Sequence, residues 1–169
     1  MQNISVSDVK QLIAAANMAL GWNDQSQATA SASDTAAAKQ RLESIFDIST
    51  RLAVYGTLAP GRSNYHIVAP LGGDWTEGVV EGDLSAHGWG AALGYPAFRP
   101  RVGGAIVPVH VLSSSSLPAF WPALDRFEGV EYHRILVPVF DSTMANPQRV
   151  LMVANLYAAT SERSPSSQR

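Results

Sequence analysis

Residues 54–58 read Val-Tyr-Gly-Thr-Leu, and residues 124–129 read Leu-Asp-Arg-Phe-Glu-Gly. In the first stretch an apolar strand runs directly into Gly56, a residue type that lets the backbone turn tightly or approach a ligand closely. In the second stretch Glu128 comes at the expected end of a helix, where Gly129 is a typical stop. The two stretches therefore mark the end of a strand and the end of a helix.

The turn after the first strand has two interpretations. Backbone N–H groups left unpaired at residues 56–58 would form a small concavity for an anion or a carbonyl oxygen. A strand that ends in Tyr-Gly is also frequently nothing more than a turn. The sequence of this stretch alone leaves both interpretations open.

The position of Glu128 is unusual for a carboxylate. The C-terminus of a helix is its negative end, so the ionised form is disfavoured there and the pKa of Glu128 is expected to rise. Phe127 and Tyr132 would add desolvation. A carboxyl group that titrates near neutrality suits general acid–base catalysis. The alternative is a solvated carboxylate that pairs with Arg126 or Arg134.

The composition divides the 169 residues into three regions. Residues 1–48 are rich in Ala, Ser and Gln and predict a helical extension, with one helix through Val9 and Leu20 and another from Asp34 to Phe46. This extension is expected to be an oligomer contact, a lid, or a helical hairpin packed outside the main domain. Residues 51–160 predict a single strand-rich domain, and residues 161–169 a disordered tail.

Five apolar stretches of the middle region predict strands, with a short helix between the third and the fourth. The stretch at residues 105–112 is apolar almost throughout, which predicts a strand covered on both faces. Serines before the helix are expected to cap it. The predicted strands are Arg51–Tyr55, Thr76–Ser85, Ala105–Leu112, Ile135–Phe140 and Val150–Tyr157, and the predicted helix is Leu117–Phe127.

Composition also excludes several classes of function. The net charge of -2 and the pI of about 6.0 argue against a nucleic-acid-binding surface. The chain contains no cysteine, which rules out disulfides and thiolate metal sites. The four histidines show no metal-ligand spacing. Neither a secretory signal nor an apolar stretch of membrane-spanning length is visible, so we expect a cytoplasmic protein.

Taken together, the two motifs resemble the γ-glutamylcyclotransferase-like superfamily, which includes γ-glutamylamine cyclotransferase and the plant AIG2-like proteins. The resemblance covers residues 52–157, and the run Leu93–Ala97 also resembles the family segment between the motifs. The family's Gly-Glu pair in the strand before the helix is absent here. The matching residues are Tyr55-Gly56-Thr57-Leu58 with Gly61 and Asn64, then Leu124-Asp125 and Phe127-Glu128-Gly129 with Tyr132 and Arg134.

The resemblance implies an α+β fold, a small mixed β-barrel with flanking helices, to which the N-terminal helical extension is added. It implies that the α-amine of a small-molecule γ-glutamyl amide attacks its own side-chain carbonyl and releases 5-oxoproline and an amine. No metal or other cofactor is required, and Glu128 is implied as the general base and acid. The implied substrate-binding residues are Tyr55, Gly56, Thr57, Leu58, Tyr132 and Arg134.

The sequence leaves alternatives open for the role of Arg134 and for the function. Arg134 is expected either to orient Glu128 or to hold the barrel wall. The same barrel, without catalysis, would bind a small amide or a protein partner. The same carboxylate would also serve an amide hydrolase or an acyltransferase. The sequence predicts neither the amine of the substrate nor an oligomeric state.

Overall fold

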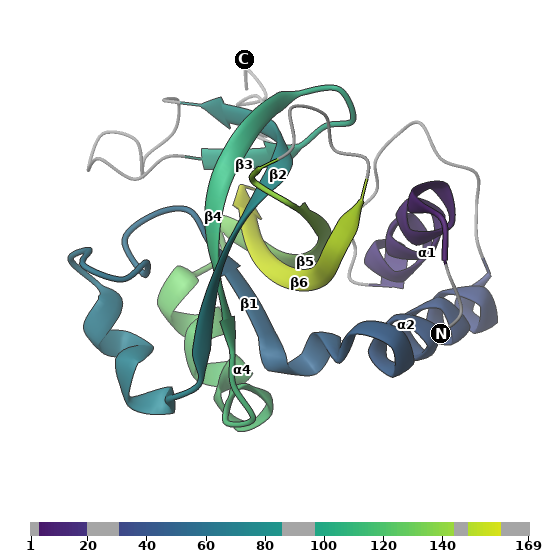
Figure 1. The fold of residues 1–169 in the computed structure, drawn as a ribbon. Coiled ribbons are helices and arrows are strands. Elements are labelled where there is room, and N and C mark those ends of the chain that lie inside the picture. Colours follow the sequence, from purple (N-terminus) through teal and green to yellow (C-terminus); the bar gives the residue numbers. More distant parts are fainter. Residues whose placement is uncertain (1–3, 20–30, 86–96, 144–148, 160–169) are drawn as a thin grey trace, which may run out of the picture.

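The computed structural model of the chain describes residues 4–19, 31–85, 97–143 and 149–159. A closed β-barrel forms its centre, in which neighbouring strands follow the order β2, β4, β1, β6 and β5 and the pairing of β5 with β2 closes the ring (Figure 1). β3 (Ala97–Pro100) adds to β2 outside the ring. In ring order the strands are Asp74–Ser85, Ala105–Ser113, Arg51–Val54, Val150–Ala159 and Tyr132–Phe140.

The barrel is mixed because one of its strand pairs is parallel. β1 and β6 run in the same direction with Leu52 opposite Asn155, whereas the other pairs in the ring are antiparallel. Helices flank the ring at residues 6–19, 32–46 and 117–128. The predicted α+β fold, a small mixed β-barrel with flanking helices, is confirmed.

Closure of the ring depends on a close approach of two strands. Val79 of β2 lies opposite Phe140 of β5. A Cβ atom at the neighbouring Gly78 would overlap the side chain of Val139. Glycine at this position therefore lets β2 and β5 come close enough to pair.

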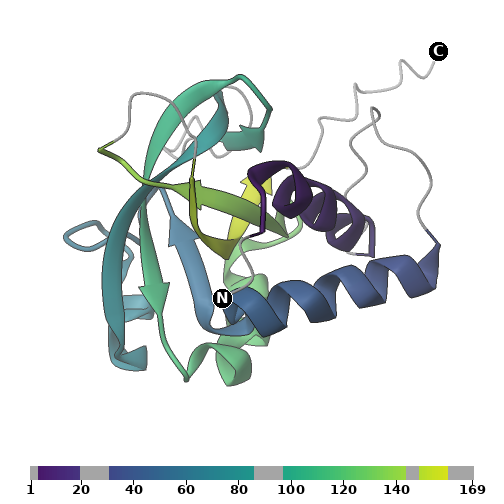
Figure 2. The same ribbon diagram turned by 45° about the vertical axis from the view of Figure 1, so that its right-hand side comes forward.

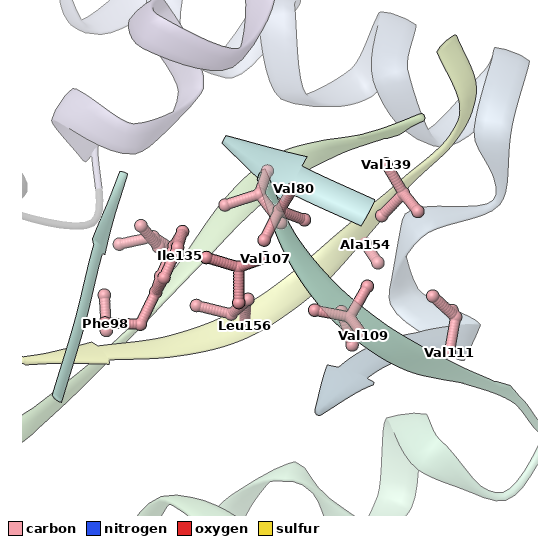
Figure 3. Packing of buried hydrophobic residues seen from close by; sticks show 12 residues of the cluster. Val80, Phe98, Val107, Val109, Val111, Ile135, Val139, Ala154 and Leu156 are labelled. Carbon is pink, nitrogen blue, oxygen red and sulfur yellow. The ribbon is translucent and has the colours of Figure 1, made fainter. Parts of the chain in front are cut away.

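Small and branched side chains fill the barrel interior (Figure 3). Because side chains alternate along a strand, every second residue of β4 and β5 points inward and the others point outward. A barrel of this size holds side chains and no open channel. The interior cluster comprises Ala53, Val80, Phe98, Val107, Val109, Val111, Ile135, Val137, Val139, Ala154, Leu156 and Ala158.

A second core lies outside β1, β4 and β6. The helix α4 (Leu117–Glu128) packs there together with the 3-10 segments η2 (Tyr65–Ile67) and η3 (Ala69–Leu71). The indole N–H of Trp121 donates a hydrogen bond of 2.9 Å to the carbonyl of Ser49 in η1 (Ile48–Thr50). This contact fixes α4 against the chain segment that leads into β1.

The N-terminal extension packs on the outer face of β5 and β6 as α1 (Val6–Ala19) and α2 (Ala32–Phe46). Figures 1 and 2 show these helices side by side on one flank of the barrel. The buried side chain of Asn17 donates to the Leu136 carbonyl at 2.9 Å and accepts from the Leu136 N–H at 2.8 Å. The described helices pack on each other and on the outside of the barrel, as the hairpin alternative expects, and a role as an oligomer contact stays a prediction.

Several details differ from the sequence-based expectations. α2 begins at Ala32 because Ser31 is its N-cap, and Asp34 completes a capping box. α4 extends to Glu128, and the side chain of Ser116 makes no capping hydrogen bond. The short strand β3 was not predicted.

The expectation that β4 is covered on both faces is wrong for its first half. Ile106 is 47% exposed, and Pro108 is exposed as well. Further along the strand Val111 packs inside the barrel and Leu112 packs in the outer core. The difference arises because α4 and the 3-10 segments cover only the second half of β4.

Some predictions concern residues that the structure does not describe. They are the tail at residues 161–169, the end of the first helix at Leu20, and residues 93–96 of the motif Leu93–Ala97.

Candidate active site

The two motifs that open the sequence analysis line a single cavity of about 160 Å³. The loop after β1 forms one part of its wall, and the end of α4 with the start of β5 forms another. Of the predicted site residues, all except Arg134 line this cavity. Its lining comprises Ala53, Val54, Tyr55, Gly56, Thr57, Leu58, Asn64, Phe127, Glu128, Tyr132 and Tyr157.

Asn64 fixes the loop after β1. Its N–H donates to the Thr57 carbonyl at 2.9 Å, and its side-chain amide donates to the Thr57 hydroxyl oxygen, also at 2.9 Å. Because that oxygen accepts from Asn64, the hydroxyl proton of Thr57 is available for another acceptor. Asn64 therefore makes the Thr57 hydroxyl a potential donor to a ligand.

The backbone of the same loop offers further donors. The Gly56 carbonyl accepts the Ala59 N–H at 3.1 Å, which forms a tight turn. Within the described residues, no hydrogen bond uses the N–H groups of Gly56, Thr57 or Leu58. A Cβ atom at Gly56 would meet nothing within 4 Å, and Gly56 is not among the residues with positive φ. Glycine is thus not required here by packing or by backbone conformation, which favours the interpretation of ligand approach.

Glu128 lies on the buried side of α4. Leu117, Trp121 and Leu124 are buried at helical spacing, and the next position of that stripe is residue 128. The Gly129 N–H bonds to the Asp125 carbonyl at 3.1 Å, and Gly129, with φ 74°, ends the helix. The sequence thus places a carboxyl group where helix packing requires an apolar side chain.

Burial raises the pKa of Glu128 from its ordinary value of 4.5 to about 7. The sequence argument expected this direction but gave first place to the helix terminus, whereas desolvation is the cause found here. The alternative of a solvated ion pair is wrong. In the described part of the chain, neither Arg126 nor Arg134 forms a salt bridge with Glu128.

Arg134 lies behind the cavity wall instead of lining the cavity. Its guanidinium donates to the Asp125 carboxylate at 3.0 Å and to the Asn155 side chain at 3.4 Å. The guanidinium also lies over the Trp121 ring, 4.5 Å from its centroid. Of the two roles expected for Arg134, these contacts match support of the wall.

Tyr157 is a cavity residue that the sequence analysis missed. Its hydroxyl donates to the Asp125 carboxylate at 2.7 Å, so the hydroxyl proton points at Asp125 and the oxygen retains lone pairs. Burial raises the pKa of Tyr157, which therefore stays protonated. Asp125 precedes Glu128 by one helical turn and so lies near the same side of α4. That spacing was a usable signal for Asp125, but nothing in the sequence places Tyr157 beside it.

Tyr55 lines the cavity, and its side chain also packs against the barrel interior. Its hydroxyl donates to the Tyr157 carbonyl at 2.9 Å and accepts the Phe98 N–H at 3.3 Å. Burial raises the pKa of Tyr55. The hydroxyl of Tyr55 is therefore engaged by the backbone.

Two features of the described residues bear on other functions. Among them, no three His, Asp or Glu side chains come together as ligands for a metal ion. No helix in the described ranges has the length and apolar character needed to cross a membrane.

The raised pKa of Glu128 predicts how stability depends on pH. Between pH 4.5 and about 7 the folded protein retains a proton that the unfolded chain has lost. The stability contributed by this group is therefore complete below 4.5 and decreases as the pH rises to about 7. Glu128→Gln cannot ionise and is expected to gain up to about 3 kcal/mol relative to the wild type between about pH 4 and about pH 8.

Urea denaturation of both proteins across this range measures the difference in the free energy of unfolding. Asp74→Asn, which removes an exposed carboxyl group, is the control and should show no comparable gain. A difference between Glu128→Gln and the wild type that stays constant with pH would contradict the burial of this carboxyl group.

Comparison with known proteins gives a family match and similar solved structures. Residues 52–168 match the family described as "Gamma-glutamyl cyclotransferase, AIG2-like". The uncharacterised protein PH0828 from Pyrococcus horikoshii has a similar solved structure, with 18% sequence identity and a TM-score of 0.46. The match covers 67% of this chain and 80% of PH0828.

The solution structure of At5g39720.1 from Arabidopsis thaliana is also similar, with 21% sequence identity and a TM-score of 0.42. The match covers 70% of this chain and 74% of At5g39720.1. A search of curated proteins found no match. Because the family match extends over more than half of the sequence, the chain belongs to the AIG2-like γ-glutamyl cyclotransferase family.

Proposed function

We propose that the protein cleaves a small γ-glutamyl amide by intramolecular aminolysis and releases 5-oxoproline and an amine. The observation that supports this most strongly is Glu128, a partly buried carboxyl group with a pKa of about 7 that shares a cavity with the Gly56–Leu58 loop. A group of this pKa can accept and return a proton at neutral pH.

In this reaction Glu128 relays protons from the α-nitrogen to the leaving nitrogen. Its carboxylate accepts a proton from the substrate's α-ammonium, and the freed amine attacks the γ-carbonyl carbon to form the ring C–N bond. Glu128 gives this proton to the amide nitrogen as the original amide C–N bond breaks. The carboxylate, ionised again, then takes the second proton from the ring nitrogen and passes it to the amine, which leaves as an ammonium ion. The nucleophile belongs to the substrate, so no Ser or Cys nucleophile is needed, and the intramolecular attack benefits from proximity.

Hydrogen-bond donors gather on the loop side of the cavity. They are the N–H groups of residues 56–58 and the hydroxyl of Thr57, which Asn64 orients. Such fixed donors suit the substrate carboxylate or the negative charge that develops on the carbonyl oxygen. The described part of the lining contains no Lys or Arg, so the proposed recognition of this negative charge is through neutral donors.

Acceptors come from other residues of the lining. Glu128 offers its carboxylate, and Tyr157 offers the lone pairs of a hydroxyl whose proton is engaged by Asp125. An α-ammonium has three protons to donate. Within this proposal, Tyr157 is a second acceptor for the ammonium, and Asp125 is the residue that positions it.

The reaction is tested with a panel of γ-glutamyl amines and detection of 5-oxoproline. We expect release from at least one member and a fall in kcat/KM of about 10²-fold or more for Glu128→Gln, because general acid–base catalysis contributes about 10²–10⁴. For the wild type, kcat/KM should rise with pH and level off above about 7, as Glu128 loses its proton.

The other outcomes identify the alternatives. Free glutamate as the product would indicate hydrolysis. Binding without turnover, unchanged in Glu128→Gln, would indicate a non-catalytic binding barrel.

The role of Tyr157 predicts a change in binding. Tyr157→Phe should raise KM about 10-fold or more with little change in kcat, because a hydrogen bond to a charged group is lost from both ground state and transition state. In Asp125→Asn the amide oxygen still accepts from Tyr157, so a smaller rise is expected. Tyr65→Phe removes a hydroxyl outside the cavity and is the matched control. An unchanged KM in Tyr157→Phe would exclude this role.

A further inference from the structure

The cavity is too small to enclose a whole substrate. Its volume of about 160 Å³ lies well below the roughly 300–1,000 Å³ of pockets that enclose a complete small ligand. If the reacting glutamyl group occupies the cavity, the remainder of the amine must lie across its rim. The residues at the rim then determine which amine is accepted.

Phe127 is the large apolar side chain at that rim. It is among the residues that line the cavity, and it is 44% exposed, so this residue borders both the cavity and the solvent. It lies one residue from the buried stripe of α4, directly before Glu128. A ring in this position can be covered by a ligand that extends out of the cavity.

The charges of the lining also indicate which leaving amine the cavity accepts. Among the described residues that line the cavity there is no Lys, Arg, His or Asp, and Glu128 is the only Glu of this set. In the proposed reaction the α-ammonium of the substrate pairs with Glu128. A charged group on the leaving amine would therefore lose water without gaining a counter-ion from the lining.

We propose that the protein prefers γ-glutamyl amides whose amine bears an apolar alkyl or aryl group, which packs on the ring of Phe127. This inference rests on the proposed function, since it assigns the leaving amine to the rim. It names a substrate class through Phe127 as the specificity-determining residue. Phe127 takes no part in proton transfer.

A homologous series of γ-glutamyl amides tests this directly, from methylamide through ethyl and propyl to butyl. In the wild type kcat/KM should rise about two- to fourfold per methylene group, as apolar surface is covered. γ-Glutamyl-glycine and γ-glutamyl-ε-lysine should be poorer substrates than the butylamide. A flat series, or a preference for the charged amines, would overturn the inference.

Two variants distinguish a specific effect of Phe127 on the kcat/KM series from the general effect of a substitution in this part of the chain. Phe127→Ser should flatten the series. Val130→Ser is the matched control, because Val130 is 94% exposed, lies three residues further along the chain and does not line the cavity. It should preserve the full increase along the series. Loss of the increase in Val130→Ser, or its retention in Phe127→Ser, would exclude Phe127 as the determinant.

Calorimetric binding of the same series to Glu128→Gln, with and without Phe127→Ser, distinguishes failure of this inference from failure of the proposed function. If no amide is turned over but Kd still falls along the series in a Phe127-dependent way, the apolar rim is supported and the catalytic proposal fails. If turnover occurs while Kd and kcat/KM are both flat, the apolar rim is excluded and catalysis stands.

Discussion

The burial of Glu128 links the packing of this protein to its proposed chemistry. The side of α4 that contributes Leu117, Trp121 and Leu124 to the outer core continues into Glu128. Packing α4 on the barrel therefore desolvates this carboxyl group, and desolvation raises its pKa to about 7. Without that packing Glu128 would be an ordinary surface carboxylate.

The barrel supplies the opposing wall of the cavity. β1 is short, and its parallel pairing with β6 sets the loop at Gly56 near Tyr157 and the end of α4. Contacts behind the cavity keep this arrangement in place. Arg134 bonds to both Asp125 and Asn155, and the Asn155 side chain donates to the Ile48 carbonyl at 2.8 Å. The segment before β1 is thus connected to the helix that contains Glu128.

The sequence predicted most of the strands because the apolar stretches are bounded by turns, and the barrel was predicted from the resemblance to a family. It also placed Glu128 and the Gly56 loop at one site through two motifs. It could not predict Tyr157 beside Asp125, because these residues meet only after β6 enters the ring. Arg134 was expected among the substrate-binding residues because of its position in the motif, but the carboxylate of Asp125 holds its guanidinium behind the wall.

The titration of Glu128 itself tests the central claim most directly. In ¹³C-labelled protein the side-chain carboxyl resonance can be assigned by its absence in Glu128→Gln and followed by NMR as the pH changes. The account predicts a midpoint near 7, as expected for a carboxyl group removed from water by the packing of α4. A midpoint near the ordinary value of 4.5 would mean that the group is solvated, and the proposed proton transfer would lose its basis.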